Sequence, residues 1–458
     1  MSSSATRIGN APTGLSRRAV VTDRDIAAAY AVDASLGSTA PEAYTVVRAR
    51  DRADVVEVLR HAQAQRIPVV PQGARTSLAG GSTASEGCIV LNVEGLDRID
   101  ELDELERFAV VGPGVVNSEL KRAAAAVGLA YPPDPASSAT CTIGGNIATN
   151  AGGLCCVKYG VTADYVRGLE VVLPGGEVMR TGRRTAKGVA GFDLTGLFVG
   201  SEGLLGVVTS AVVRLVSAPD PALTALATFG TLDAATAGIL ALRRDRFGPS
   251  LLELLDAASI SAIQQVADYG FPGDCAAVLI ASSDRPGNTA EDVQRYASLL
   301  ASAGATDVAV ADDAQESEAL LAGRRALHTA LEVKGPHFTE DLCVPVARLA
   351  DLIRAGEEVS TRRGVDITLS GHAGDGNVHP CFFFTQGDPV SQRRAEDAFG
   401  DLVVLALDMG GTITGEHGVG TLKRHWLQRE LGEPELARQR AVKAVFDPLG
   451  IMNPGKVL

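Results

Sequence analysis

Residues 132–153 read PPDPASSATCTIGGNIATNAGG, a run in which small and turn-forming residues replace large apolar ones. Because protein interiors are densely packed, such a run cannot fill the space around itself, and a bound group has to do so. Its glycines let a flat ligand approach the backbone, and its hydroxyl and amide side chains can hydrogen bond to that ligand. The residues concerned are Ser138, Thr142, Gly144, Gly145, Thr149, Asn150, Gly152 and Gly153. The run therefore predicts a site for a large planar ligand.

Two further glycine-rich segments point to the same kind of ligand. Residues 71–83, PQGARTSLAGGST, follow a β-rich run; their NH groups and hydroxyls can cradle a phosphate, and Arg75 adds positive charge. This segment has neither the GxGxxG nor the GxxxxGKS/T spacing, which disfavours a Rossmann site and a P-loop NTPase. Residues 196–212 place Ser201, Glu202 and Gly203 before another β-rich run. A large cofactor with a diphosphate and a planar ring would use the segments 71–83 and 132–153, and the third segment could bring further backbone groups to the same ligand. For 71–83 alone, an ordinary surface loop is the alternative.

The length and composition predict an ordinary multidomain protein. A chain of 458 residues is too long for one hydrophobic core, and its 46% hydrophobic and 21% charged residues favour a soluble protein. No apolar run approaches the ~18 residues of a membrane span, and the N-terminus lacks the pattern of a secretory signal. The net charge of −13, with no evident basic cluster, argues against nucleic-acid binding. Seven scattered cysteines fit a reducing compartment, so we expect a cytoplasmic protein, with peripheral membrane attachment as a variant.

The order of helical and β-rich runs predicts an α+β protein with two domains and a returning tail. Helical and β-rich stretches alternate over residues 42–218, the core of a first domain spanning 1–219. The segment SAPDPA, residues 217–222, marks the boundary. Residues 220–411 predict a second domain, an antiparallel sheet with helices on one face. Residues 412–458 are rich in glycine and proline, and we expect them to pack back on the first domain.

Two histidine clusters predict a metal site with a base beside it. In SGHAGDGNVHP, residues 370–380, the spacing of seven between His372 and His379 suits two strands joined by a turn. Glu416 and His417 are adjacent in GTITGEHGVG, so in an extended segment they point to opposite sides. We assign Glu416 to the metal with the two histidines and leave His417 as a base. Zinc is the first choice, with manganese or iron compatible; core histidines and a surface Glu-His pair are the alternative.

The three glycine-rich segments, in this order, resemble the FAD-binding domain of vanillyl-alcohol oxidase or PCMH-type flavoproteins. Nearly the whole chain is similar to FAD-linked D-2-hydroxyacid dehydrogenases: the cytochrome-type D-lactate dehydrogenases, the FAD subunit of glycolate oxidase and D-2-hydroxyglutarate dehydrogenase. HAGDGNVH and EHGVG match the family's metal and base motifs position by position. The resemblance implies FAD bound by Pro71, Gly73, Ala74, Arg75, Thr76, Ser77, Gly80, Pro133, Asp134, Ser138, Thr142, Ile143, Gly144, Gly145, Asn146, Thr149, Asn150, Ala151, Gly152, Glu202, Gly206, Val207, Val208 and Asn453.

Departures from the family pattern bear on the flavin. Members that attach flavin covalently use a histidine near these loops, and the sequence has none between His61 and His328, so noncovalent FAD is expected. Arg75 stands where many relatives carry glycine, and Leu204 where they commonly carry threonine.

The implied reaction is oxidation of a D-2-hydroxyacid to the 2-oxoacid. The metal would chelate the substrate's carboxylate and hydroxyl, His417 would take the hydroxyl proton, and hydride would pass from Cα to flavin N5. Arg324 matches a position where relatives hold a substrate carboxylate; the alternative is a solvated helix arginine. Thr339 stands where 2-hydroxyglutarate enzymes use a lysine, which favours a small substrate such as lactate or glycolate over a dicarboxylate.

The electron acceptor has to be a separate molecule. Since no CxxCxxC iron-sulfur pattern is present, electrons would pass to a quinone, a cytochrome, an electron-transfer flavoprotein or oxygen, and not to NAD. A homodimer or a complex with a partner subunit is compatible with the sequence. Two other functions compete: group transfer of the alkylglycerone-phosphate synthase type, and a flavin-binding partner subunit of a glycolate oxidase with no catalysis of its own.

Overall fold

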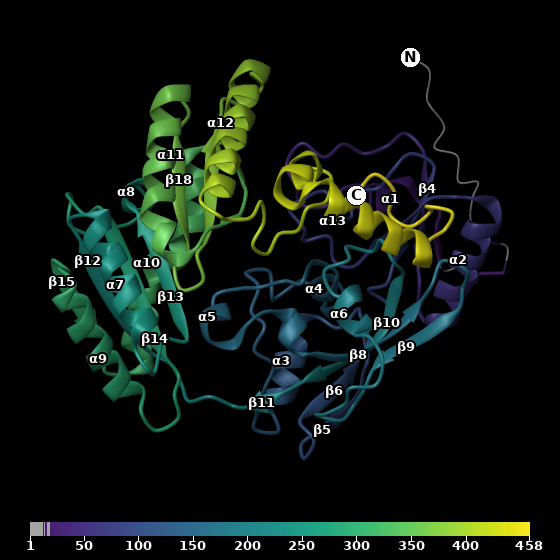
Figure 1. Cartoon of the computed structure of the whole chain (residues 1–458), viewed down its shortest axis with the longest axis horizontal. Coiled ribbons are helices and arrows are strands. Elements are labelled where there is room, and N and C mark those ends of the chain that lie inside the picture. The colour runs from purple at the N-terminus through teal and green to yellow at the C-terminus, as the bar shows by residue number, and fades with distance from the viewer. Residues whose placement is uncertain (1–11, 13, 16–18) are drawn as a thin grey trace. The chain divides into compact units, whose positions relative to one another are not determined.

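The computed structural model describes residues 12, 14–15 and 19–458. Residues 1–11, 13 and 16–18, at the start of the predicted first domain, lie outside the described residues. The chain forms two compact units. Unit 1 contains the chain up to Gly152, Val161–Ala218 and Glu416–Leu458, and unit 2 contains Gly153–Gly160 and Pro219–Gly415. Figure 1 shows the elements of each. No helix in the described part of the chain is both long and apolar enough to span a membrane.

The first sheet of unit 1 is mostly parallel and has the strand order β1-β2-β4-β3. Its strands are β1 (Val20–Val21), β2 (Tyr44–Arg48), β3 (Val69–Gln72) and β4 (Cys88–Asn92). Helix α2 (Arg52–Gln65) crosses from β2 to β3, and the Asp51 side chain caps its start by accepting a hydrogen bond from the backbone NH of Asp54. A bridge between Val69 and Met452 joins the C-terminal segment to β3. The segment thus completes the core beneath the loop that follows β3.

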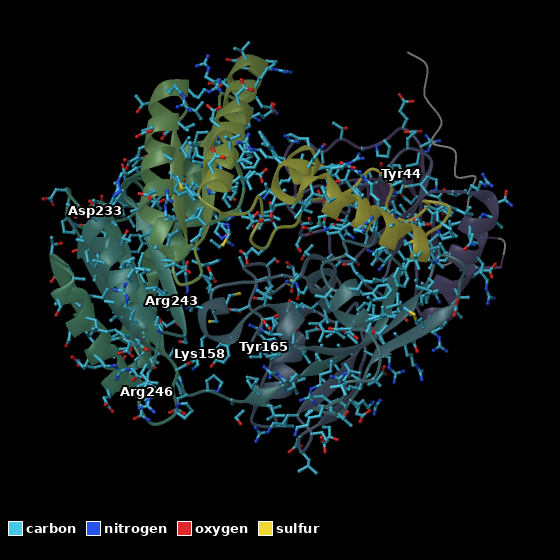
Figure 2. The ribbon with its side chains drawn as sticks, viewed as in Figure 1. Tyr44, Lys158, Tyr165, Asp233, Arg243 and Arg246 are labelled. Atoms are coloured by element: carbon cyan, nitrogen blue, oxygen red, sulfur yellow. The ribbon has the colours of Figure 1, made fainter. Side chains whose placement is uncertain are left out.

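The second sheet of unit 1 is antiparallel, in the order β5-β6-β10-β8-β9. Its strands are β5 (Ile99–Asp103), β6 (Phe108–Val111), β8 (Val166–Val172), β9 (Val178–Gly182) and β10 (Val207–Arg214). In β10, buried positions alternate with more accessible ones, as in a strand that buries one face. At its end Arg214 lies over the ring of Tyr165, a side chain labelled in Figure 2.

The remaining elements of unit 1 are short, apart from one C-terminal helix. They are α1 (Arg24–Ala28), α3 (Asn117–Ala125), α4 (Ile143–Thr149), α6 (Leu194–Phe198), α13 (Leu427–Phe446), the 3-10 turns η1 (Thr162–Asp164) and η3 (Arg424–Trp426), and the paired strands β7 (Leu129–Ala130) and β11 (Val216–Ser217). Helix α13 is kinked at Gly432, two residues before Pro434, because proline cannot continue the helical hydrogen bonds.

Unit 2 is built on one antiparallel sheet in the order β15-β12-β14-β13-β18-β19-β16, with β17 also paired to β19. Its strands are β12 (Leu223–Phe229), β13 (Leu251–Asp256), β14 (Ala277–Ser283), β15 (Asp307–Val310), β16 (His337–Thr339), β17 (Leu342–Cys343), β18 (Ile367–His372) and β19 (Asn377–Phe383). The α+β class and the antiparallel sheet of the second domain are as the sequence predicts.

Helices cover both faces of this sheet, so the prediction of helices on one face was wrong. The helices of unit 2 are α5 (Cys156–Tyr159), α7 (Leu232–Arg244), α8 (Ala257–Gln264), α9 (Thr289–Ser302), α10 (Ala314–Lys334), α11 (Leu349–Arg363) and α12 (Pro389–Asp408), with the 3-10 turn η2 (Val346–Arg348). On β14, Val278 and Ile280 pack with α8 and α10, whereas Leu279 faces α7 and α9 around Gly238. Every residue of β14 is buried, because a strand covered on both sides is apolar throughout.

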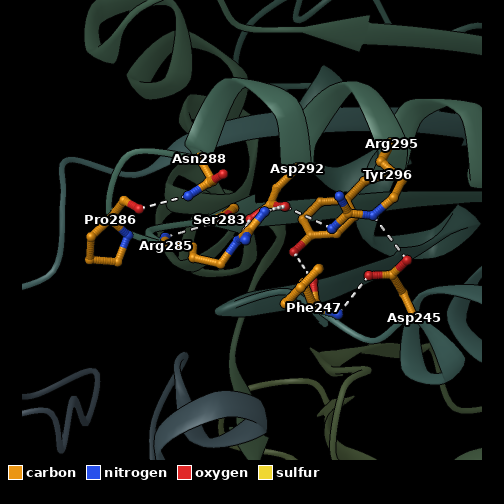
Figure 3. A network of polar contacts seen from close by, with 9 residues as sticks. All are labelled: Asp245, Phe247, Ser283, Arg285, Pro286, Asn288, Asp292, Arg295 and Tyr296. Atoms are coloured by element: carbon orange, nitrogen blue, oxygen red, sulfur yellow. Dashed lines mark hydrogen bonds and ion pairs between the residues drawn. The ribbon is translucent and has the colours of Figure 1, made fainter.

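A buried carboxylate fixes α9 to this sheet (Figure 3). Asp292 accepts a hydrogen bond from Ser283 Oγ at 2.8 Å, two from Arg285 at 2.6 and 2.8 Å, and one from Arg295 at 2.7 Å. Arg295 also bonds to Asp245, at 3.0 Å. Burial alone would raise the pKa of Asp292, but the hydrogen bonds from Arg285, Ser283 and Arg295 hold it at about 2.

Replacing Asp292 by Asn should lower the free energy of unfolding by roughly 2 kcal/mol at pH 7. The depressed pKa stabilises the folded state above pH 3.8, the pKa of the unfolded carboxyl, and this contribution is lost as the pH falls through about 2. The difference from the parent chain should therefore shrink to about half at pH 3. Urea unfolding at both pH values measures it, with the exposed Asp307→Asn as the control; a difference independent of pH would contradict the assignment.

Candidate functional site

A pocket in unit 1 is lined by the three glycine-rich segments, with Val93, Pro113, Glu416 and His417 completing its walls. The sequence-predicted residues that line it are Pro71, Gly73, Ala74, Arg75, Thr76, Ser77, Thr142, Gly144, Gly145, Asn146, Thr149, Ala151, Gly152, Glu202, Gly206, Val207 and Val208. Pro113 was missed, although it precedes Gly114 in a turn-forming pair. Segments far apart in sequence thus surround one space.

Seven predicted residues are not among the described lining residues: Gly80, Pro133, Asp134, Ser138, Ile143, Asn150 and Asn453. Some of them support the wall from behind. Ile143 is fully buried at the start of α4, and Asn150 ends that helix in a left-handed conformation. Asn453 Nδ2 donates to the carbonyl oxygens of Gly81, at 2.9 Å, and Glu202, at 2.8 Å. It therefore holds two lining segments together.

Glycines at the pocket allow its walls to meet. A Cβ at Gly73 would lie 2.5 Å from Thr142 Oγ1, and one at Gly144 would lie 2.6 Å from Pro113 Cβ. Thr142 caps α4, since its Oγ1 accepts a hydrogen bond from the backbone NH of Gly145 at 3.3 Å. A pocket whose walls are backbone and small side chains suits a large flat ligand, as the sequence predicts.

Arg75 has a structural partner of its own. Its φ is +61°, a left-handed conformation that glycine adopts without cost. The guanidinium pairs with Glu94 at 3.0 Å and lies 4.5 Å from the centre of the Tyr30 ring. Its charge is thus partly neutralised by Glu94, which sequence reasoning did not foresee.

Glu202 ties the C-terminal segment to this pocket. Its carboxylate accepts hydrogen bonds from the backbone NH groups of Val419, at 2.8 Å, and Gly420, at 2.9 Å. Burial raises the pKa of Glu202 despite these hydrogen bonds and the charges of Lys423 and Lys456. Lys456 in turn donates to the carbonyl oxygens of Gly80, at 2.8 Å, and Thr83, at 2.6 Å. The segment that carries Glu416 and His417 is thereby held against the pocket wall.

The two predicted metal histidines lie on a β-hairpin of unit 2. Strands β18 and β19 pair His372 with Asn377 and Ser370 with His379, so the histidines are diagonal neighbours on one face. This confirms the prediction of two strands joined by a turn. The Nε2 atoms of His372 and His379 are 3.2 Å apart. Gly376 closes the turn at φ +86°, where a Cβ would lie 2.0 Å from the Val344 carbonyl oxygen.

Glu253 is a site residue that the sequence prediction missed. It lies on β13, directly opposite His372, and is fully buried. Its Oε1 accepts a hydrogen bond from His372 Nδ1 at 2.6 Å, and its Oε2 one from Arg324 Nε at 2.7 Å. Burial alone would raise the pKa of Glu253, but the charges of His372 and Arg324 hold it below its usual value. The only signal in the sequence was an acid in the middle of the apolar run LLELL, residues 251–255.

Arg324 and Thr339, the residues with a predicted bearing on substrate, have other contacts in unit 2. The Arg324 fork lies 21% exposed beside Glu253, so it is not a solvated helix arginine. Thr339 Oγ1 lies 3.2 Å from Cys381 Sγ. Lys334, which is near Thr339 in sequence, pairs with Asp366 at 2.5 Å.

The histidine pair fits a tetrahedral metal ion. Two nitrogens bound to one zinc ion at about 2.0–2.1 Å would lie roughly 3.3 Å apart. The observed separation of 3.2 Å agrees with that value. In its neutral form, a His372 ring that donates its Nδ1 proton to Glu253 presents a lone pair at Nε2, as in histidines that bind metal with a carboxylate behind them.

Comparisons with known proteins agree with a flavoprotein of the PCMH fold. Solved structures with this fold include p-cresol methylhydroxylase, with a TM-score of 0.77, 18% identity, and 96% of this chain and 94% of that chain covered. The 4-ethylphenol oxidase of Gulosibacter chungangensis has a TM-score of 0.75, 19% identity, and coverage of 97% and 98%. The chain therefore has the PCMH-type fold.

More closely, the chain belongs to the FAD-linked oxidases. It matches the family "FAD linked oxidases, C-terminal domain" over residues 218–457 and "FAD binding domain" over residues 43–182. The glycolate oxidase subunit GlcD of Bacillus subtilis is 40% identical over 90% of this chain and 88% of its own length. A D-lactate dehydrogenase of Archaeoglobus fulgidus is 33% identical over 94% of this chain and 95% of its own. The FAD-binding domain match confirms the prediction of FAD.

Replacing Gly73 by Ala should weaken FAD binding roughly tenfold, because the added methyl group displaces Thr142 and narrows the pocket. Flavin absorbance relative to protein after dialysis measures the loss. Gly273→Ala is the matched control, since a Cβ there meets no atom within 4 Å. Equal flavin retention by both variants would show that this contact does not shape the flavin pocket.

Proposed function

We propose that the chain oxidises a small D-2-hydroxyacid to the 2-oxoacid, using noncovalent FAD and a divalent metal, zinc by preference and otherwise manganese or iron. The observation that carries the proposal is the pair of Nε2 atoms of His372 and His379, 3.2 Å apart, with Glu253 behind one ring. The names of the relatives support the substrate class, since they are a glycolate oxidase subunit and D-lactate dehydrogenases.

The third metal ligand in this proposal is Glu416. It follows Gly415, whose NH donates to Asp341 Oδ2 at 2.6 Å. A Cβ at Gly415 would lie 2.5 Å from Asn377 Cγ, so this point of the chain is packed against the start of the His379 strand. Two imidazoles and one carboxylate form a metal shell that leaves positions open for a substrate.

The residues of the chain then have distinct tasks. When bound, FAD supplies the hydride acceptor and the metal a Lewis acid that lowers the pKa of the substrate hydroxyl. A ring nitrogen of His417, which lines the FAD pocket, takes the hydroxyl proton. The Arg324 fork orients the substrate carboxylate while its Nε stays on Glu253. Glu253 is a positioning residue, because it fixes the tautomer and orientation of His372.

The substrate we favour is a monocarboxylate such as D-lactate or glycolate. Thr339, at the position of the lysine of the 2-hydroxyglutarate enzymes, offers a hydroxyl near Cys381 in place of a second cation. A 2-hydroxyglutarate type substrate would need that cation for its distal carboxylate.

Electrons are proposed to leave the flavin for a separate acceptor: a quinone, a cytochrome, an electron-transfer flavoprotein or oxygen. Two relatives are named as subunits, which favours a complex with partner chains, and we place the protein in the cytoplasm or at the membrane surface. The group-transfer alternative has less support, because the alkyldihydroxyacetonephosphate synthase structure shares 18% identity and shows the fold alone.

The proposal is tested by mixing the purified yellow protein anaerobically with D- and L-2-hydroxyacids, before and after EDTA. We expect one D-acid or glycolate to bleach the flavin, EDTA to stop the bleaching, and added zinc or manganese to restore it. Absence of bleaching by every acid in metal-replete protein would overturn the proposal and bring forward the noncatalytic subunit or the synthase.

Replacing His417 by Ala should leave flavin content unchanged and slow flavin reduction by about 10²- to 10⁴-fold, the usual contribution of a general base. Stopped-flow absorbance measures the rate. The exposed His425→Ala is the control. A rate equal to that of the parent chain would remove His417 from this role.

Replacing Glu253 by Gln should weaken metal binding by roughly 10- to 100-fold, with flavin content retained, because the amide no longer fixes the His372 tautomer. Metal content by mass spectrometry after dialysis against a weak chelator is the readout. Glu332→Gln is the matched control, as it removes a carboxylate 3.3 Å from His328 on the surface. Unchanged metal content in the Glu253 variant would contradict the positioning role.

A further inference from the structure

A second hollow, entirely within unit 2, lies apart from the residues of the proposed reaction. It measures about 340 Å³, within the roughly 300–1,000 Å³ typical of small-molecule pockets. We call it the arginine hollow. The lining residues that bear on its chemistry are Lys158, Arg243, Arg246, Phe247, Arg285 and Asp292. Figure 2 labels Lys158, Arg243 and Arg246.

The charge of the arginine hollow is positive in a chain whose net charge is −13. Four cations line it, against the single carboxylate of Asp292. Lys158 pairs with Asp284, and Arg285 with Asp292. Arg243 and Arg246 are exposed, and neither has an ion pair with any carboxylate of the described residues. Two cationic charges thus remain uncompensated at the rim.

Hydrogen bonds and a ring contact hold the side chains in the inner part of the hollow. Asp292 holds Arg285 through two hydrogen bonds, of 2.6 and 2.8 Å, and the guanidinium carbon of Arg285 lies 4.0 Å from the centre of the Phe247 ring. The Phe247 carbonyl oxygen accepts a hydrogen bond from Tyr296 at 2.6 Å, which fixes the loop that carries Arg246 (Figure 3). One guanidinium is therefore fixed in orientation before any ligand arrives, and this reduces the entropy cost of binding.

We propose that the arginine hollow binds a phosphate-bearing small molecule. A phosphate group carries up to two negative charges and several acceptor oxygens, which matches two uncompensated guanidinium groups beside a fixed third one. The site is built from unit 2 residues alone and shares none with the FAD pocket of unit 1 or with the histidine hairpin. The inference does not depend on the proposed oxidation.

Calorimetry on the full-length, flavin-loaded protein at low ionic strength tests the proposal, with inorganic phosphate, pyrophosphate, ADP and citrate as separate probes. Loading with FAD keeps the diphosphate probes out of the other pocket. The test variant is the double replacement Arg243→Ala and Arg246→Ala. Arg244→Ala is the matched control, because Arg244 is an exposed neighbour on α7 that does not line the hollow.

We expect pyrophosphate or ADP to bind to the parent protein. The Kd should be at least tenfold higher in the double variant and within twofold of the parent value in the control. Binding should also weaken at high salt. Arg285→Lys, which keeps the charge and loses the fork, should also weaken binding. If ADP binds more tightly than inorganic phosphate, the phosphate group that the hollow binds belongs to a free nucleotide. Binding to vesicles with phosphatidic acid, lost in the double variant, identifies a lipid headgroup.

Three results would overturn the proposal. The first is no binding of any phosphate probe or phosphatidic acid vesicle to the parent protein. The second is binding that the double variant retains at full strength, and the third is citrate binding more tightly than pyrophosphate at equal ionic strength.

Discussion

The glycine-rich pocket of unit 1 depends on one half-buried carboxylate. Glu202 lies in a left-handed conformation, with φ +47°, within the third glycine-rich segment and accepts hydrogen bonds from Val419 and Gly420. Glycine-rich walls have few side chains with which to hold each other, so polar contacts from elsewhere have to fix them. Asn453 and Lys456 supply more such contacts, all to backbone carbonyl oxygens of the first and third segments. Because small residues make room for a cofactor, hydrogen bonds from other parts of the chain have to hold the pocket walls in place.

The sheet of unit 2 also contains buried carboxylates, and each is neutralised by cationic or hydrogen-bonding partners. Glu253 has no exposed surface, and a buried carboxylate without partners would be strongly destabilising. His372 and Arg324 compensate it from two different elements, and Asp292 is compensated by Arg285 and Arg295 near the end of the same sheet. Each network constrains the side chains that it neutralises. The fixed orientation of His372 is one result.

Features that depend on local sequence were predictable, and those that depend on long-range pairing were not. The hairpin of His372 and His379 follows from their spacing around a glycine turn, and the α+β class follows from the alternation of runs. The partner of His372 could not be predicted, because Glu253 reaches it through strand register over 119 residues of sequence. Apolar strands such as β14 indicate burial on both faces, and that signal was overlooked. The arginine hollow was not visible as a basic cluster either, since Lys158, Arg243 and Arg285 meet only through folding.

The division of the chain into units has a consequence for biosynthesis. The backbone passes from one unit to the other after Gly152, Gly160, Ala218 and Gly415, so neither unit is continuous in sequence. On the ribosome, the glycine-rich walls are made early. His417, the Glu202 partners Val419 and Gly420, and Asn453 are made only after all of unit 2. Closing a loop of that length is an entropic cost that comes late in folding. The glycine-rich pocket can therefore be complete only after translation has passed Lys456, and until then its walls lack the contacts that hold them together.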